Sequence, residues 1–341
     1  MLPQFEAETA DQVWRQAAAA LLTGGEYITQ RGRNGDTREL LHCTLHVRDP
    51  RQRWALSRQP SMNPAFAIAE VVWILCGRND SGFLNFWNPV LPKFAGEGAF
   101  YHGAYGHRLS ANFGIDQVER AYRALAADQD SRQVVLQIWD PNKDLPDGDG
   151  KPQSKDIPCN IVSLLKVRNG KLDWLQLMRS NDLYRGAPHN FIQFTSLQEV
   201  MAGWLGVELG SYIHVADSLH LYERDLAEMS ITSEMPALDN EDRLGCPWPI
   251  FIPIIRAMER ALDELRSEEL KPNQFTGLVA DQDLPEGWRN LLRIVAADAA
   301  RRRGWMQEME WAASTCSNRV LNTAWTQWLS RTLRASHVRG I

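Results

Sequence analysis

The sequence predicts an α+β fold, on the strength of three observations. Apolar runs rich in β-branched residues at 40–48, 134–139 and 211–217 are typical of strands. Two further runs, IVSLLKV and LDWLQLM, flank RNGK, whose Asn-Gly pair is a favoured two-residue hairpin turn. Helical periodicity occurs between these strands and dominates the last hundred residues. Strands and helices therefore share the first part of the chain, and helices alone fill the last part.

The remaining elements follow in chain order. Helical patterns are expected at 11–30, 65–76, 115–128 and 190–206, and loops rich in polar, glycine or proline residues at 31–39, 82–113 and 140–156. Residues 236–249, PALDNEDRLGCPWP, are interpreted as a connector. We therefore expect a core over residues 1–235 and a helical region over 236–341. Its tryptophans supply a large apolar area, which predicts that it packs on the core.

Composition limits the class of protein. The chain has 341 residues and a net charge of −5, with 44% hydrophobic and 23% charged residues, the usual balance for a globular protein. Mild acidity argues against nucleic acid or an anionic membrane as a partner. No apolar run approaches the roughly 18 to 20 residues of a membrane span, and the acidic N-terminus lacks a signal core. A cytoplasmic location is expected.

One of the five cysteines stands apart by its position. No CxxC pair or Cys/His cluster has metal-ligand spacing, so neither a disulfide framework nor a metal site is predicted. Most of the cysteines fit the role of small buried hydrophobes. Cys159, in DIPCN, instead follows a loop and precedes a strand. Such a junction can present a thiol to a cleft while holding its backbone rigid.

Polar residues after the hairpin indicate a partner for this cysteine. The hairpin returns Arg179 towards Cys159, where a guanidinium would lower the thiol pKa and favour the nucleophilic thiolate. Arg179 and Ser180 together could grip a phosphate. Asn190 is either a helix N-cap or an amide that matches a pyrimidine edge. His220 and Tyr222, two residues apart, share one face of an extended segment.

These pieces, taken in order, resemble the thymidylate synthase family. PCN, RNGK, RSND, GAPHN and HLY occur between residues 156 and 225 in the family's order and with similar spacing. Further matches upstream are the helix carrying Glu70, Tyr105 in AYG, DSRQ around Arg132 and the arginine loop RGRNGDTRE. The resemblance covers roughly residues 20–225. It implies a large mixed sheet with helices packed on one face and a homodimer formed through the other.

The resemblance also implies roles for individual residues. Cys159 would add to C6 of a pyrimidine nucleotide, Glu70 would order water and relay protons, and Tyr105 would assist removal of the C5 proton. Asn190 would read the O4 and N3–H edge of the base. The co-substrate would be 5,10-methylenetetrahydrofolate, contacted by Trp87, Asp182, Gly186 and His189. Arg33, Arg179 and Ser180 would bind the phosphate, and Arg132 would reach it from the second subunit. His220 and Tyr222 would hold the sugar. Asp182 is expected to contact the substrate as well as the folate.

Departures from the family pattern leave the product open. Asn160, Gln133, Met178, Arg185 and His189 stand where the family has other residues, and its C-terminal strands and short apolar tail are not recognisable. In the family that tail closes the site and excludes water, so that hydride from the folate gives a methyl group. A chain with a different closing device can admit water, which gives a hydroxymethyl group. Both 5-hydroxymethyl-dUMP and dTMP are therefore expected products. The neutral amide of Asn190 favours dUMP over dCMP or CMP, although an amide can flip. A CMP or dCMP 5-hydroxymethylase and a nucleotide-binding pseudoenzyme remain alternatives.

Overall fold

The computed structural model describes residues 2–25, 27–32, 35–232, 238–280 and 282–339. Its strands, in chain order, are β1 (Gln4–Ala7), β2 (Ile28–Gly32), β3 (Gly35–Val47), β4 (Arg58–Gln59), β5 (Val135–Gln137), β6 (Asn160–Arg168), β7 (Lys171–Met178), β8 (Asn181–Asp182), β9 (Glu208–Tyr222) and β10 (Ser230–Ile231).

Eight of these strands form one mixed sheet. Its order is β1-β3-β9-β7-β6-β5, with β2 added to β3 and β8 added to β9. β1 runs parallel to β3, and both β7 and β8 run parallel to β9. The remaining neighbours in this sheet are antiparallel. The large mixed sheet predicted from the sequence is thereby confirmed.

The helices of the described residues are α1 (Ala10–Thr23), α2 (Pro64–Leu75), α3 (Ser81–Trp87), α4 (Pro92–Ala95), α5 (Tyr105–Ser110), α6 (Gln117–Ala127), α7 (Pro141–Asp144), α8 (Gly186–Leu205), the 3₁₀ turn η1 (Glu223–Asp225), α9 (Trp248–Arg266), α10 (Pro272–Ala280), α11 (Glu286–Arg302), α12 (Met306–Thr315) and α13 (Arg319–Arg339). The helical C-terminal region expected from periodicity is therefore present.

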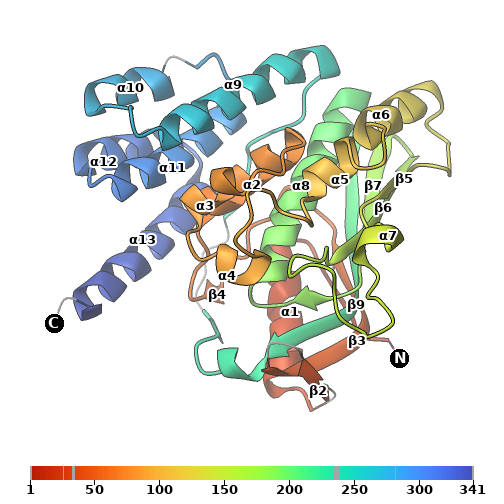
Figure 1. The fold of residues 1–341 in the computed structure, drawn as a ribbon. Coiled ribbons are helices and arrows are strands. Elements are labelled where there is room, and N and C mark those ends of the chain that lie inside the picture. Colours follow the sequence, from red (N-terminus) through yellow and green to blue (C-terminus); the bar gives the residue numbers. More distant parts are fainter. Residues whose placement is uncertain (1, 26, 33–34, 233–237, 281, 340–341) are drawn as a thin grey trace.

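The helices build up in layers from one face of the sheet (Figure 1). α1 packs on β3, and α8 packs on β7 and β9. α2 covers α8, and α9, α11 and α13 pack in turn on α2. Aromatic contacts from α8 to Trp174 and Tyr212 mark the covered face of the sheet. α2 thus lies inside the protein between the sheet layer and the C-terminal helices.

The opposite face of the sheet is apolar and open. Strand alternation points the neighbours of Trp174 and Tyr212 away from α8. Two cross-strand rows of exposed or half-buried aliphatic side chains result: Val135, Leu164, Leu175 and Ile213, and then Val162, Leu177 and Val215. This is the face through which the sequence predicts dimerisation.

Several element boundaries differ from the prediction. The first helix ends at Thr23, and the segment expected as a loop at 31–39 belongs mostly to the β2–β3 hairpin. Short helices occupy parts of the expected loops 82–113 and 140–156, because proline or a polar cap begins each of α4 and α7. The Asn169-Gly170 turn is confirmed, with φ of 52° and 72°.

The start of α8 changes the interpretation of Asn190. α8 begins at Gly186, four residues earlier than the helical pattern indicated. Asn190 therefore lies inside the helix and is 5% exposed. The N-cap interpretation of Asn190 is wrong, which leaves the amide available for a different purpose.

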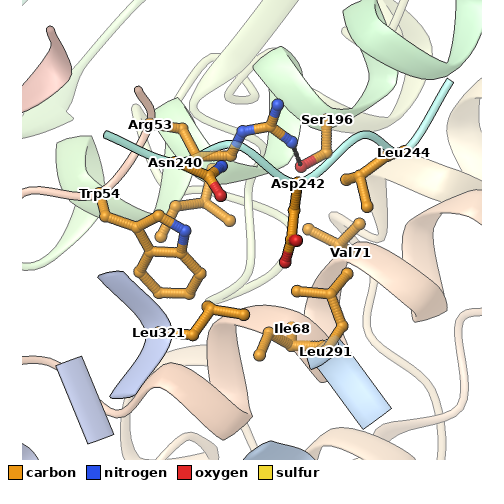
Figure 2. Close-up of a pocket in the computed structure, with 11 residues that line it drawn as sticks. Arg53, Trp54, Ile68, Val71, Ser196, Asn240, Asp242, Leu244, Leu291 and Leu321 are labelled. Carbon is orange, nitrogen blue, oxygen red and sulfur yellow. Dashed lines mark hydrogen bonds between the residues drawn. The ribbon is translucent and has the colours of Figure 1, made fainter. Parts of the chain in front are cut away.

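The connector after residue 237 is clamped between α8 and α11. A side chain at Gly203 of α8 would place its Cβ 2.3 Å from the Cys246 nitrogen, and one at Gly287 of α11 would lie 2.5 Å from the Arg243 carbonyl oxygen. Glycine is needed at both positions because backbone passes too close for any side chain. Figure 2 shows the small cavity beside this passage, with Arg53 donating to Ser196 Oγ at 2.8 Å.

Candidate active site

Cys159 lies at the junction where the sequence predicts a nucleophile. It immediately precedes β6 and is half-buried. Burial raises the pKa of Cys43, Cys76 and Cys316 to about 12, and burial also raises the pKa of Cys246. Those four thiols therefore stay protonated at neutral pH. None of the five cysteines is in a disulfide.

Arg179 holds the loop that carries this cysteine. Its Nε donates to the Pro158 carbonyl at 2.9 Å and its Nη2 to the Ile157 carbonyl at 3.1 Å. Its backbone N–H donates to the Cys159 carbonyl at 2.9 Å, and its guanidinium lies 5.5 Å from the Trp139 ring centroid. Arg179 thus fixes the backbone carbonyls of three consecutive residues, Ile157, Pro158 and Cys159. A lowered pKa of the thiol stays a prediction.

Tyr105, the first residue of α5, connects the expected catalytic groups. Burial, and then the charges of Cys159 and Asp156, raise the pKa of the Tyr105 hydroxyl well above its ordinary value. The nearby Asn160 side chain opposes that shift of the pKa, and the charge of Glu70 adds to it. The hydroxyl therefore remains protonated at neutral pH. Glu70, Tyr105 and Cys159 occupy one neighbourhood, although they come separately from α2, from α5 and from the residue before β6.

A first chain of buried amides ends beside Tyr105. Ser163 Oγ and Trp174 Nε1 donate to Gln176 Oε1 at 2.5 and 3.2 Å. Gln176 Nε2 then donates to Asn160 Oδ1 at 2.8 Å. Because Gln176 receives two donors on its oxygen, its amide has one orientation, and so does that of Asn160. The Asn160 Nδ2 is consequently turned towards the neighbourhood of Tyr105, and no atom of the described residues meets hydrogen-bond geometry with it.

A second chain fixes the amide of Asn190. Asn181 Nδ2 donates to Asn190 Oδ1 at 2.8 Å, and Asn190 Nδ2 donates to Gln193 Oε1 at 2.9 Å. One lone pair of Oδ1 and one hydrogen of Nδ2 are left for a ligand. Gly186 makes room for this arrangement, because a Cβ there would lie 3.0 Å from Asn181 Nδ2.

His214 sets the direction of the second chain. It is fully buried, and desolvation lowers its pKa to about 3, so the ring is neutral. Asn181 Oδ1, which can only accept, lies 3.2 Å from His214 Nε2, so Nε2 carries the hydrogen of the neutral ring and donates it. His214 Nδ1 then accepts at 2.9 Å from the O–H of Tyr212, whose pKa burial raises well above its ordinary value. The amide of Asn181, and through it that of Asn190, cannot flip without breaking the chain.

The residues expected to bind phosphate and sugar lie partly together. Ser180 Oγ is 3.5 Å from His220 Nδ1, and the His220 and Tyr222 rings meet edge to face at 5.2 Å. Both aromatic side chains are on β9 and share one face, as predicted. Arg132 is exposed on the loop before the edge strand β5. Arg33 lies outside the described residues.

Three of the four residues expected to face folate flank the turn before α8: Asp182 ends β8, and Gly186 and His189 lie in the first turn of α8. Asp182 Oδ1 accepts from the backbone N–H groups of Tyr184 and Arg185 at 2.8 and 2.9 Å, which stabilises the turn. Arg185 pairs through both terminal nitrogens with Asp225. Trp87 is fully buried, so it lies beneath a surface layer and its side chain is not open to solvent.

Three residues that shape the site were not predicted from the sequence. Gln176, Asn181 and His214 are polar, yet at most 2% of each is exposed. A signal was present in two strands: alternation in LDWLQLM and SYIHVAD places Gln176 and His214 on the same face as large aromatic residues. A polar residue at a buried strand position requires a partner, and here the partners lead to the site.

Two features are absent from the residues that the structure describes. Within them, no group of three or more His, Cys, Asp or Glu side chains is arranged to hold a metal ion. Among the same residues, no helix combines the length and apolarity needed to cross a bilayer.

Comparisons with known proteins agree with the resemblance noted in the sequence. The sequence profile of the family described as thymidylate synthase matches residues 12–238. The deoxyuridylate hydroxymethyltransferase of Bacillus phage SP01 is 36% identical over 283 residues, covering 76% of this chain and 72% of that protein. A protein of the same description from Delftia phage PhiW-14 is 32% identical over 291 residues, covering 80% and 81%. A putative thymidylate synthase of Methanothermobacter marburgensis is 29% identical over 236 residues, covering 67% and 96%.

Proposed function

Because the chain belongs to the thymidylate synthase family, we propose that it transfers the one-carbon unit of 5,10-methylenetetrahydrofolate to C5 of dUMP and releases 5-hydroxymethyl-dUMP. The substrates follow from the family, and the product follows from a finer comparison. The sequence leaves two products open. 5-Hydroxymethyl-dUMP forms when water adds to the one-carbon group on the nucleotide, and dTMP forms when hydride adds to it.

One observation carries the choice of product. Residues 1–238 make up about 70% of the chain, whereas the two phage hydroxymethyltransferases match 76% and 80% of it. Part of each match must therefore lie in the helical C-terminal region. The match to the putative thymidylate synthase covers 67% of the chain and nearly all of that shorter protein. At least the beginning of the C-terminal region is thus shared with these two proteins described as hydroxymethyltransferases, which supports the hydroxymethyl product.

The geometry supports a stepwise mechanism on the nucleotide. The Cys159 thiolate adds to C6, which makes C5 nucleophilic towards the one-carbon unit. Loss of the C5 proton follows, assisted by Tyr105, and the bond between the one-carbon unit and the folate nitrogen breaks, which releases tetrahydrofolate and leaves an exocyclic methylene on the pyrimidine ring. Water adds to that methylene, and expulsion of Cys159 from C6 restores the aromatic ring. Asn190 offers Oδ1 to N3–H and Nδ2 to O4, the pattern that uracil presents.

The site also has polar atoms suited to its ligands. Glu70 Oε2, His189 Nδ1 and Asn160 Nδ2 are buried without a geometric hydrogen-bond partner among the described residues. Buried polar groups of this kind normally meet a ligand or water. Asp182, Gly186 and His189 remain our proposal for the folate side, whereas the full burial of Trp87 argues against a direct contact of that side chain with folate.

A homodimer completes the phosphate site in this proposal. The two aliphatic rows on the open sheet face offer an apolar surface, which supports pairing of two sheets. Arg132 would then reach the nucleotide phosphate of the partner, next to Arg179 and Ser180. Sedimentation equilibrium tests the dimer. Mixing C159A and R132A protomers tests the shared site, because only a mixed dimer contains one site with both residues intact.

The mass of the product tests the reaction. The enzyme is incubated with methylenetetrahydrofolate and, separately, with dUMP, dCMP, UMP and CMP. A hydroxymethyl product from dUMP, with release of tetrahydrofolate, is expected. A methyl product together with dihydrofolate would overturn the hydroxymethyl assignment, and a product from dCMP or CMP alone would overturn the base assignment. Nucleotide binding without release of tritium from [5-³H]dUMP would identify a pseudoenzyme.

A further inference from the structure

His189 and Glu70 form a pair at the edge of the site. His189 Nδ1, on α8, lies 3.5 Å from Glu70 Oε2, on α2. Both atoms are buried, and among the described residues neither has a partner that meets hydrogen-bond geometry. The two side chains nevertheless keep 19% and 18% of their surface exposed. The pair therefore meets at its buried end and presents its other end outward.

The surroundings hold the imidazole in one orientation. Phe66 packs against the His189 ring at 5.1 Å with an interplanar angle of 62°. Phe66 and Glu70 are four residues apart on α2, so one helical face supplies both the aromatic contact and the carboxylate. A carboxylate at Nδ1 keeps the proton on that nitrogen and leaves Nε2 as the basic atom. The separation of 3.5 Å is long, as is common for catalytic hydrogen bonds before substrate binds.

The pair is adjacent to the groups that handle the nucleotide. His189 directly precedes Asn190, whose amide is fixed for base recognition. Glu70 acts on the Tyr105 hydroxyl, which also responds to the charge of Cys159. His189 therefore neighbours the two groups proposed to act on the base, Asn190 and Tyr105, and it is also one of the residues expected to face folate.

We propose that His189, oriented by Glu70, is the base that activates the water which adds to the exocyclic methylene; this inference rests on the proposed function. His189 Nε2 takes a proton from water as the oxygen bonds to the methylene carbon. The methylene π electrons move to form the C4 enolate. The enolate then re-forms the C4 carbonyl and the C5=C6 bond, and the Cys159 sulfur leaves as thiolate. Nothing is oxidised or reduced, so the folate leaves as tetrahydrofolate.

Two quantities measured together test this role. Tritium release from [5-³H]dUMP reports the steps up to the methylene, and 5-hydroxymethyl-dUMP reports the addition of water. In His189→Phe we expect the ratio of hydroxymethyl product to tritium released to fall at least tenfold. A small thiol added to the reaction should then capture the waiting methylene as a thioether. His189→Asn, which keeps a polar side chain without a basic nitrogen, should give the same fall.

His46 provides a matched control. Its Nδ1 lies 3.5 Å from Glu6 Oε1, the same separation as in the proposed pair, but it is on β3 beside β1. Strands β9 and β7 separate it from β6 and Cys159. His46→Phe should leave the product ratio at the wild-type value.

The possible failures are separable. A wild-type ratio in both His189 variants would overturn the assignment of the base while leaving the proposed function intact. Wild-type enzyme that releases no tritium, or that makes only dTMP, would overturn the proposed function itself. If His189→Phe does not fold, as judged by its thermal transition, His189→Asn decides the question.

Discussion

Buried polar side chains serve different purposes in the sheet core and in the C-terminal helical region. In the core, the chains through Gln176 and His214 end at Asn160 and Asn190, each of which keeps a hydrogen-bonding group for the site. At the base of the C-terminal region, Asn318 Nδ2 donates to Asn240 Oδ1 and Asp242 Oδ2, both at 2.7 Å. That second network bonds to itself and to the connector.

The difference separates recognition from attachment. An open hydrogen-bond chain aims a donor or acceptor at a ligand, because every earlier group in the chain has a fixed orientation. A closed network directs no donor or acceptor at a ligand. It joins segments that are distant in sequence. Substitutions in the first kind should therefore change chemistry, whereas substitutions in the second kind should change stability.

Replacing the nucleophile should give the largest effect and touch only the chemistry. In Cys159→Ala we expect product formation and C5 tritium release to fall by at least about 1,000-fold, since the nucleophile proposed to add to C6 is lost. The free energy of unfolding should change by less than about 1 kcal/mol. Cys246→Ala, outside the site, should retain activity. Tritium release by Cys159→Ala near the wild-type rate would exclude the covalent mechanism.

Replacing Glu199 tests how strongly the connector to the C-terminal helices is attached to the core. This α8 residue is 3% exposed, pairs with Arg53, accepts from Arg51 Nε at 3.2 Å and accepts from the Leu244 N–H of the connector at 3.2 Å. Glu199→Ala leaves a buried guanidinium unpaired and should lower the free energy of unfolding by about 3–5 kcal/mol. Urea denaturation measures it. Glu208→Ala, which breaks a pair whose side chains are 56% and 79% exposed, should change stability by less than about 1 kcal/mol.

The sequence predicted those parts of the site that depend on local order. Cys159 at a loop-to-strand junction, the Asn-Gly hairpin and the shared face of His220 and Tyr222 follow from short-range patterns, and all three appear in the structure. The alternation of the strands also indicated a sheet. The resemblance to the family implied a mixed sheet, but strand order and the parallel pairing of β7 with β9 were not predicted, because neighbouring residues do not determine them.

Other features depended on contacts that no local pattern reveals. The Asn181–His214 contact joins residues 33 positions apart, and the pair between His189 and Glu70 joins two helices. Asn190 was ambiguous because cap preference and base recognition favour the same side chain. Only the start of α8 at Gly186 removed the capping interpretation. The β2–β3 hairpin was missed because its polar residues resemble those of a loop.

Acidification should weaken the core through His214. Its folded pKa of about 3 is below the unfolded value of about 6.5, so its contribution to stability is present above pH 6.5 and is lost as pH falls. Between pH 7.5 and 5.0 this amounts to about 2 kcal/mol. His214→Gln should lose that much less stability than wild type over the interval, measured by urea denaturation at both pH values.

A control and a contrary result sharpen this prediction. His42 is largely exposed and has a φ of 54°, which asparagine tolerates, so His42→Asn should show the wild-type pH dependence. Equal pH dependence in wild type and His214→Gln would mean that His214 is not held neutral. The assigned direction of the hydrogen-bond chain would then lose its basis.

Asn181→Asp should have the smallest but most specific effect: it should shift the preference for the base from uracil towards cytosine. A carboxylate at 181 still accepts from His214 Nε2–H, but it can only accept from Asn190, so Asn190 must turn its Nδ2 towards it. The oxygen and nitrogen that Asn190 offers a base then exchange places. We expect kcat/KM for dUMP to fall about tenfold, roughly 1.4 kcal/mol, while that for dCMP rises relative to it. Asn181→Ala, which removes the donor without imposing the opposite orientation, should weaken the preference without reversing it. An unchanged ratio in Asn181→Asp would show that the fixed amide of Asn190 does not select the base.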